Sequence, residues 1–378
     1  MNIFFIGPYR QQDEWGRKSH SILKAIQRGG HNVTARPIFL SSDLSYNTYS
    51  EPSEFIILEN YDILIQFVLQ PYATYMGEFA KRIGIFNTET LPYNLPLGHL
   101  TKELLMDEVW IDSPSVALKT QDILHNHNTT INVKAIPPLL DVESLPLTSA
   151  NSVKMSDPAL QNRFIFYYIG SVADAKDGLR ETVMAYTNAF NHQDAVALVV
   201  MPENIVDGNL LEQIIQECHA CAGERNVAAH RPLIKALVEQ PTLEKRMALH
   251  IGGDCMVCPS YSLTTSSLVL EAAVYECSPI VNKGNACYEW WGEENLWGVE
   301  SFEEICIHKD RPLPYRFTSS ESWHRPVVKS LSEAMKDAYT NKFKRDKKRT
   351  SNSKLREHFK NATIDIAPPN NDYVGKIS

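Results

Sequence analysis

The sequence lacks any long hydrophobic run: no apolar stretch among its 378 residues approaches the roughly 20 residues that a membrane-spanning helix needs. The opening MNIFFIGPYR has no basic segment before its short apolar run, so we expect no signal peptide. All seven cysteines lie at or after position 218, a pattern that does not suit a disulfide scaffold. The ordinary composition, 43% hydrophobic and 22% charged, excludes a disordered or collagen-like chain. These features predict a globular, cytoplasmic protein.

Several ligand-binding motifs are also missing. No Asp-x-Asp occurs, so the sequence predicts no Mg²⁺–diphosphate clamp of that type and no other metal. Neither a GxGxxG dinucleotide fingerprint nor a GxxxxGK[ST] phosphate loop is present. Two cysteine pairs, Cys218/Cys221 and Cys255/Cys258, do have the spacing of zinc ligands. However, the first pair follows a helical pattern and the second lies in a short buried strand, so zinc is the weaker alternative.

The charge is unevenly distributed. The chain carries 37 basic and 45 acidic residues, a net charge of −8, yet residues 341–360 hold nine Lys or Arg against two acidic residues. The acidic remainder argues against a broad nucleic-acid surface. The run KFKRDKKR at residues 342–349 could make a weak contact with an anionic partner, although a solvated helix face is the simpler interpretation.

The first forty residues predict a strand–loop–helix–strand unit. Residues 2–6 form a short apolar run bounded by Gly7-Pro8, and a polar loop follows. An amphipathic helix is predicted over 17–28, ending at Gly29-Gly30, and a second strand comes after it. This is the repeating unit of a parallel doubly wound sheet. Further buried strands are expected at 61–68, 82–86 and 107–112.

The same pattern begins again after a proline-rich linker. Expected strands at 164–169, 195–201, 255–260 and 279–281 alternate with helices at 178–190 and 268–275. The sequence therefore predicts an α/β protein with two Rossmann-like domains facing across a cleft. We place the domains at 1–150 and 151–340, followed by a basic C-terminal helix and tail at 341–378.

Three loops precede predicted helices and are candidate anion sites, because helix N-termini present free N–H groups. They run from Gly7 to Gly16, from Gly170 to Gly178, and from Thr264 to Ser267. In the third, Glu271 follows one turn along an otherwise apolar helix. That spacing would let the loop hold phosphate while the carboxylate accepts two ribose hydroxyls. A carboxylate among such neighbours needs a partner.

One stretch carries a specific resemblance. CMVCPSYSLTTSSLVLEAAVYECSPIVNKGNACYEWWGEENLWGV, which starts at Cys255, resembles the donor-binding core of the family 4 (group 1) retaining glycosyltransferases of GT-B fold. The matching elements are Pro-Ser, the small-residue loop, Glu-Ala, Pro-Ile-Val and a Gly loop followed by Glu. FIFYYIGSVADAKDGLRETVMAYTNAF is similar to the family's diphosphate loop, and the N-terminal GPYRQQDEWGRKSHSILKAIQRGGHNV to its opening glycine loop. The resemblance spans roughly residues 1–340.

The resemblance implies transfer of a sugar from a nucleotide-diphosphate donor to an acceptor with retention, without a metal or other cofactor. The implied donor-binding residues are Gly16, Gly170, Ser171, Lys176, Ser266, Ser267, Glu271, Gly284 and Glu289. The implied catalytic residues are Lys176, Glu89 and Arg17, with His20 and His99 as further candidates. The acceptor could be a saccharide, a lipid, a protein or a modified nucleobase.

Two positions depart from the family pattern. Leu263 stands where the family usually has a first glutamate, and Ser171 stands where an arginine commonly follows the glycine. Each change removes a charged contact of the kind that stabilises a bound donor. The alternative hypothesis is therefore a catalytically weakened GT-B-fold subunit that binds or scaffolds without turnover.

Overall fold

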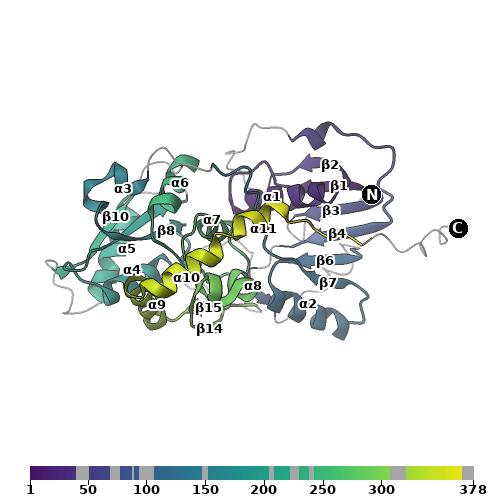
Figure 1. Cartoon of the computed structure of the whole chain (residues 1–378). Coiled ribbons are helices and arrows are strands. Elements are labelled where there is room, and N and C mark those ends of the chain that lie inside the picture. Colours follow the sequence, from purple (N-terminus) through teal and green to yellow (C-terminus); the bar gives the residue numbers. More distant parts are fainter. Residues whose placement is uncertain are drawn as a thin grey trace. The chain divides into compact units, whose positions relative to one another are not determined.

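The structure, a computed structural model of the whole chain, divides into two compact units (Figure 1). Unit 1 comprises Met1–Glu143, Ile305–Ser322 and Glu357–Ser378, and unit 2 comprises Ser144–Glu304 and Trp323–Arg356. His99, one of the histidines named above, lies outside the described residues. The residues that the structure describes are 1–39, 51–68, 77–86, 89–92, 106–146, 152–203, 208–221, 230–237, 242–306 and 321–367.

Unit 1 is built on a six-stranded parallel sheet with the order β2-β1-β3-β4-β6-β7. Its strands are short apolar runs; every residue of β3, with the sequence ILIQF, is buried, as expected when helices or loops cover both faces of a parallel sheet. The elements of this unit are β1 (Asn2–Gly7), α1 (Glu14–Arg28), β2 (Asn32–Pro37), η1 (Pro52–Phe55), β3 (Ile63–Phe67), β4 (Lys81–Ile85), β5 (Leu91–Pro92), β6 (Glu108–Ile111), α2 (Pro114–Asn126) and β7 (Asn132–Ala135).

Helix α1 begins three residues earlier than the sequence pattern predicts. Asp13 caps it, because its side chain accepts a hydrogen bond from the N–H of Gly16 at 2.9 Å. A Cβ atom on Gly16 would lie 1.9 Å from the carbonyl oxygen of Gln11, so only glycine fits there. Gly16 and Arg17 therefore belong to the first turn of a helix, and our assignment of Gly16 to a loop is corrected.

Unit 2 contains a second six-stranded parallel sheet, with the order β10-β9-β8-β11-β12-β13. The chain first adds strands on one side of β8 and then crosses to its other side, which is the strand order of a Rossmann fold. The two predicted Rossmann-like sheets are thus confirmed. The elements are α3 (Val153–Ser156), η4 (Pro158–Leu160), β8 (Phe164–Gly170), η5 (Ala175–Asp177), α4 (Leu179–Ala189), β9 (Val196–Pro202), α5 (Gly208–Cys221), β10 (Leu233–Ala236), α6 (Leu243–Gly252), β11 (Cys255–Cys258), α7 (Ser267–Val274), β12 (Ile280–Asn282), α8 (Ala286–Asn295), β13 (Trp297–Val299), β14 (Ser301–Ile305), β15 (Glu321–Pro326), α9 (Val328–Thr340), α10 (Lys342–Asn352) and α11 (Leu355–Asn361); β14, β15 and α11 pass from one unit into the other.

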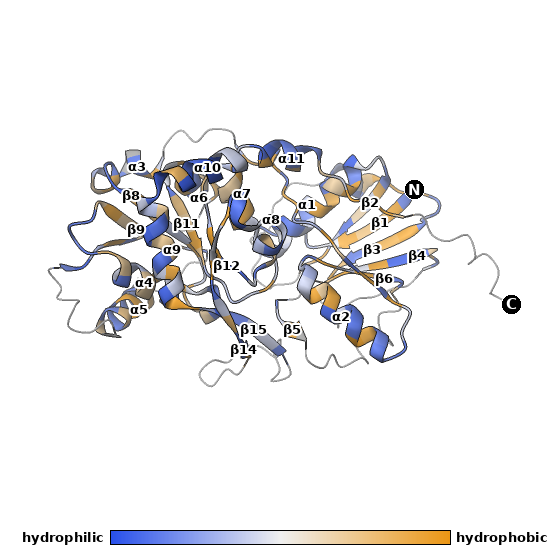
Figure 2. Ribbon diagram, turned by 60° about the horizontal axis from the view of Figure 1, so that its bottom comes forward, coloured by the Kyte–Doolittle hydropathy of each residue, from blue (hydrophilic) through white to orange (hydrophobic). Residues whose placement is uncertain are grey.

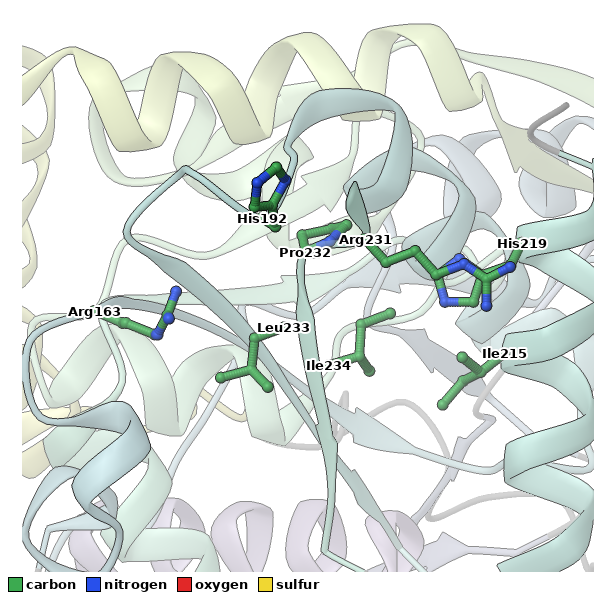
Figure 3. Close-up of a pocket in the computed structure, with 8 residues that line it drawn as sticks. All are labelled: Arg163, His192, Ile215, His219, Arg231, Pro232, Leu233 and Ile234. Atoms are coloured by element: carbon green, nitrogen blue, oxygen red, sulfur yellow. The ribbon is translucent and has the colours of Figure 1, made fainter. Parts of the chain in front are cut away.

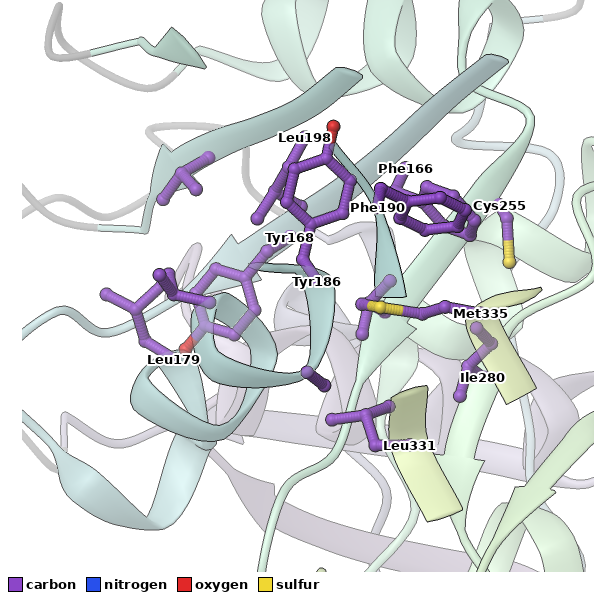
Figure 4. Packing of buried hydrophobic residues seen from close by; sticks show 14 of the residues in the cluster. Phe166, Tyr168, Leu179, Tyr186, Phe190, Leu198, Cys255, Ile280, Leu331 and Met335 are labelled. Carbon is purple, nitrogen blue, oxygen red and sulfur yellow. The ribbon is translucent and has the colours of Figure 1, made fainter. Parts of the chain in front are cut away.

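The main core of unit 2 lies between one face of this sheet and helices α4, α5 and α9. Aromatic rings of Phe166, Tyr186 and Phe190 pack together there, and α9 contributes Leu331 and Met335 (Figure 4). Figure 2 shows the contrast in hydropathy between core and surface elements: β11 is mostly hydrophobic and α10 is hydrophilic. Each helix buries one apolar stripe of side chains against the sheet, and this stripe fixes how the helix lies on it.

The basic run at 342–349 forms most of α10, and several of its charges bind unit 2 itself. Lys348 donates to the carbonyl oxygen of Leu296 at 2.7 Å and lies over the ring of Trp297. Arg345 donates to the last carbonyls of α9 and lies over the ring of Phe164. Contact with an external anion stays a prediction.

Among the described helices, none combines the length and the apolar character required to cross a membrane.

Candidate functional site

Three loops meet at one edge of the unit 2 sheet. Strands β8, β11 and β12 are neighbours and run parallel, so the loops that follow their carboxyl ends, 171–178, 259–266 and 283–285, lie at the same edge. The strand order reverses between β8 and β11, and ligands of doubly wound sheets bind at such a point. This edge brings together six of the predicted donor residues: Gly170, Ser171, Lys176, Ser266, Ser267 and Gly284.

The first two loops are hydrogen-bonded to each other around Lys176. Its carbonyl oxygen accepts hydrogen bonds from the N–H of Tyr261 at 2.7 Å and from the Ser260 hydroxyl at 3.3 Å. Gly178 adopts a φ of +79°, and a Cβ atom there would lie 2.7 Å from the carbonyl oxygen of Pro259. Close contact between the loops therefore depends on glycine at 178, and the backbone of Lys176 is held in place.

Two carboxylates accompany the lysine, and the sequence reading overlooked both. Asp174 accepts a hydrogen bond from the backbone N–H of Lys176 at 3.1 Å, and Asp177 accepts one from the N–H of Ser171 at 2.8 Å. Burial raises the pKa of Asp177 to about 7, against the lowering influence of Lys176. The charge of this loop therefore changes near neutral pH. The run of charges in VADAKD, residues 172–177, was the sequence signal that could have indicated these two carboxylates.

The second and third loops are also joined. The side-chain amide of Asn285 donates to the carbonyl oxygens of Ser262, at 3.1 Å, and Thr264, at 2.7 Å. The N–H of Ala286 donates to the carbonyl oxygen of Leu263 at 3.0 Å. Helix α7 starts at Ser267, and the side chain of its N-cap residue, Ser266, makes no capping hydrogen bond. These contacts hold the start of α7 at the shared edge.

Glu271, the predicted ribose ligand, has its partner in helix α6. Its side chain is 1% exposed, and Oε2 lies 2.9 Å from Nε of Arg246 and 3.3 Å from Nε2 of His250. His250 in turn is hydrogen-bonded through Nδ1 to the Tyr167 hydroxyl at 2.9 Å. A buried carboxylate needs a partner of this kind. The sequence alone did not identify Arg246 as the partner of Glu271. The ribose role of Glu271 stays a prediction.

Gly284 and Glu289 lie around a histidine that the sequence reading missed. A Cβ atom on Gly284 would lie 2.1 Å from Nδ1 of His324, so the imidazole takes the space beside the glycine. Burial lowers the pKa of His324, while the charge of Glu289, an exposed residue of α8, opposes that shift. Only the tertiary structure brings His324, from β15, to this loop.

The remaining predicted residues belong to unit 1. Arg17 donates to the carbonyl oxygen of Gln12 at 2.8 Å and pairs with Glu14 at 3.0 Å. Glu89 is partly exposed and precedes β5 by two residues.

His20 has two acidic neighbours in the same unit. Its Nε2 lies 2.8 Å from Glu51 and its Nδ1 lies 3.4 Å from Asp141. Two flanking carboxylates suit a structural ion-pair network, the more common role of a partly buried histidine. This pairing was not predicted from the sequence.

The zinc alternative gains no support from the part of the chain that is described. No group of three or more His, Cys, Asp or Glu side chains that could hold a metal ion occurs there. The thiol of Cys255 instead donates to the carbonyl oxygen of Ser278 at 3.0 Å, and burial raises its pKa. A protonated, buried thiol is a poor zinc ligand.

Comparison with known proteins identifies the class of fold. No family model and no curated protein matches the sequence. Solved structures do match. The E. coli trehalose-6-phosphate protein bound with UDP-2-fluoro glucose has a TM-score of 0.61 at 11% identity, covering 97% of this chain and 100% of that one. The N-terminal domain of Candida albicans trehalose-6-phosphate phosphatase has a TM-score of 0.60 at 12% identity, with coverages of 96% and 93%.

A third match is the trehalose 6-phosphate synthase of Burkholderia multivorans, with a TM-score of 0.55 at 13% identity over 80% of this chain and 67% of that one. At such identities the likeness shows the fold alone. The chain has the GT-B fold, and the predicted fold class is confirmed. Membership of glycosyltransferase family 4 stays a prediction.

Proposed function

We propose that this protein is a glycosyltransferase that moves a sugar from a nucleotide-diphosphate donor to an acceptor, with retention of anomeric configuration. The observation that carries the proposal is the contact between the Lys176 loop and the Pro259–Tyr261 loop at the switch point of the unit 2 sheet. The GT-B likeness supports it, because a UDP-sugar analogue is bound to one of the similar proteins. The family 4 resemblance adds the retaining stereochemistry.

Unit 2 would bind the donor. Lys176 and the first N–H groups of α7 would meet the diphosphate and stabilise its charge as the glycosidic bond breaks. Gly170 and Ser171 would let the backbone approach the phosphates closely. Glu271 would accept the ribose hydroxyls, which requires its carboxylate to be shared with or released from Arg246. Ser266, Ser267, Gly284 and Glu289 would complete the donor contacts.

Unit 1 would bind the acceptor, which could be a saccharide, a lipid, a protein or a modified nucleobase. Gly16, Arg17 and Glu89 would contact the acceptor or the transferred sugar. Because a lysine and a helix terminus supply the positive charge, we propose that the reaction needs no metal. We also propose a cytoplasmic location.

The alternative is a subunit that has kept the fold and lost turnover. Leu263 and Ser171 favour it, since neither can supply the charge that the family has at these positions. Lys176, Glu271 and Glu289 favour the transferase. The two hypotheses differ in one observable, which is cleavage of the donor.

Calorimetry with UDP, GDP and ADP tests the donor site. The parent should bind one of them, and Lys176→Ala should weaken that binding by roughly 10- to 100-fold, the value of a charge-assisted contact. Lys154→Ala is the matched control, because Lys154 is ion-paired with Asp254 before the opposite, amino end of β11 and should leave affinity unchanged. Equal affinity of Lys176→Ala and the parent would contradict the site.

Hydrolysis of a panel of nucleotide sugars then separates the two functions. A transferase should cleave its preferred donor slowly in water. Tight nucleotide binding with no cleavage of any donor, and no transfer to added acceptors, would favour the inactive subunit.

A further inference from the structure

A cavity of about 390 Å³ lies in unit 2, away from the three loops of the candidate site. Figure 3 shows Arg163 on one flank, with Arg231 and His219 on the other and Leu233 and Ile234 between them. The described residues that line it are Arg163, His192, Ile215, His219, Arg231, Pro232, Leu233 and Ile234.

The cavity belongs to the amino-terminal edge of the sheet. Arg163 directly precedes β8, His192 precedes β9, and Arg231 and Pro232 directly precede β10. These strands are parallel to each other and to β11, so their amino ends lie at the edge opposite to the loops around Lys176. A ligand in this cavity would not occupy the proposed donor site.

Among the lining residues that the structure describes, every polar side chain is a base: two arginines and two histidines, with no carboxylate. Arg163 makes three hydrogen bonds of 3.2 Å, through Nε and Nη1, and all go to the neutral backbone carbonyls of Ala159, Asp194 and Val196. Neutral carbonyls orient the guanidinium and do not cancel its charge. The positive charge of Arg163 therefore remains available at the cavity.

Arg231 is the stronger indication of a ligand. Within the described part of the chain it makes no hydrogen bond or ion pair, and its Nε atom is buried without a partner. Leaving a buried donor of a charged group unsatisfied is costly, so such groups normally have a partner. His219, which is 7% exposed, lies beside it, and its pKa is lowered by burial and by the charge of Arg231. Two neighbouring bases thus face the same space.

The apolar residues of the cavity limit what the ligand can be. Leu233 and Ile234 lie between the two basic flanks, and Ile215 lies on the side of His219, so the ligand needs a carbon body as well as an anionic group. The volume lies within the range of roughly 300–1,000 Å³ that small-molecule sites have. This volume suits a small metabolite.

We propose that this cavity binds a small organic anion, a phosphorylated or carboxylated metabolite, with its anionic group on Arg231 and Arg163 and its carbon body on Leu233 and Ile234. The site is independent of the proposed glycosyltransferase activity. Phosphate and carboxylate share the chemistry that two arginines recognise, and the test distinguishes them.

The test is calorimetry on the full chain with inorganic phosphate, glycerol 3-phosphate and citrate. We expect at least one organic anion to bind more tightly than inorganic phosphate, because only it uses the apolar residues. Arg231→Gln should weaken that binding by roughly 10- to 100-fold, and Arg231→Glu should weaken it further. Since Arg231 has no partner in the described structure, neither variant should disturb folding, which circular dichroism checks.

Arg180→Gln is the matched control for the loss of one positive charge. Arg180 lies in the same unit and is ion-paired with Glu217 at 2.6 Å, so its removal should leave anion affinity unchanged. Lys176→Ala should leave it unchanged as well. Binding that is absent in the parent, unaffected in both Arg231 variants, or weakened equally by Lys176→Ala would each overturn the proposal.

Discussion

The carboxylate of Glu271 forms a buried ion pair with the guanidinium of Arg246, 2.9 Å from Nε to Oε2, which joins helix α7 to helix α6. Glu271 is 1% exposed and Arg246 is 17% exposed in their side chains. A residue predicted from the sequence as a ligand contact is therefore also a structural contact in this state. The two roles predict different effects for a substitution of Glu271 and for a substitution of Arg246.

Replacing Glu271 by Ala should lower both stability and nucleotide affinity. Removing one partner of a buried ion pair leaves the other uncompensated, a loss on the order of 3 kcal/mol in the free energy of unfolding. Loss of the ribose contacts should weaken nucleotide binding by roughly 30- to 1000-fold. Arg246→Ala is the control, because it breaks the same pair and keeps the carboxylate. A Glu271→Ala protein that is destabilised but binds nucleotide like the parent would show that the ribose role is wrong.

Gly178→Ala should destabilise the protein more than Gly30→Ala. Both glycines have a φ near +80°, of +79° and +77°, so both substitutions carry the same backbone strain, about 1–2 kcal/mol. Only at 178 would the new Cβ also lie 2.7 Å from a backbone oxygen, that of Pro259; at 30 nothing lies within 4 Å. Urea denaturation midpoints compare the two. Nucleotide affinity should fall only for the 178 variant, and equal midpoints would contradict the close approach of the loops.

Nucleotide affinity should fall as pH rises from 6 to 8. Burial raises the pKa of Asp177 to about 7 from an ordinary 3.8, so the proton is held below pH 7 and the contribution of Asp177 to stability is lost as pH rises through that value. The new negative charge lies in the same loop as Lys176 and opposes a bound diphosphate. Asp177→Asn should flatten the profile. Because the ionisation of the nucleotide is common to both proteins, only a difference between their profiles supports the assignment; identical profiles refute it.

Glu51 should contribute stability that is lost in acid. A hydrogen bond from His20 is the largest influence on the pKa of Glu51 and, with Lys24, lowers it from 4.5 to about 2 despite burial. A depressed pKa stabilises the fold above pH 4.5, and this contribution disappears as pH falls through 2. Glu51→Gln should lower stability at pH 7 by roughly 3 kcal/mol and flatten the slope between pH 5 and 2. The exposed Glu59→Gln should do neither, as thermal unfolding across pH would measure.

Donor cleavage should survive chelation. Lys176 and the start of α7 would supply the charge that a metal supplies elsewhere, so EDTA should leave the rate within about twofold of its untreated value. Loss of activity that Mg²⁺ restores would contradict this proposal. The measurement also tests the zinc alternative, which requires loss of folding or activity on prolonged chelation.

Much of the fold could be predicted from the sequence because the signals are local. Apolar runs such as ILIQF predict buried strands, and the glycine pair after Arg28 correctly predicted the end of α1. The start of α1 was less accurate, because the Asp13 cap begins the helix before the apolar pattern starts. Boundary errors of this kind arise where a capping residue, and not the apolar period, decides the first turn.

In the candidate site, too, some features could be predicted from the sequence and others could not. The loops that hold Lys176 and the small residues before α7 were predicted because each follows a strand, and Lys176 itself was named from the family resemblance. The sequence alone determined the two parallel sheets and the loops at their edges, since hydrophobic period and turn residues act over a few positions. Only the tertiary structure decided that Arg246 pairs with Glu271, that His324 lies beside Gly284, and that four bases surround one cavity. The first two contacts join residues that are 25 and 40 positions apart, and no local pattern encodes which distant side chain completes them.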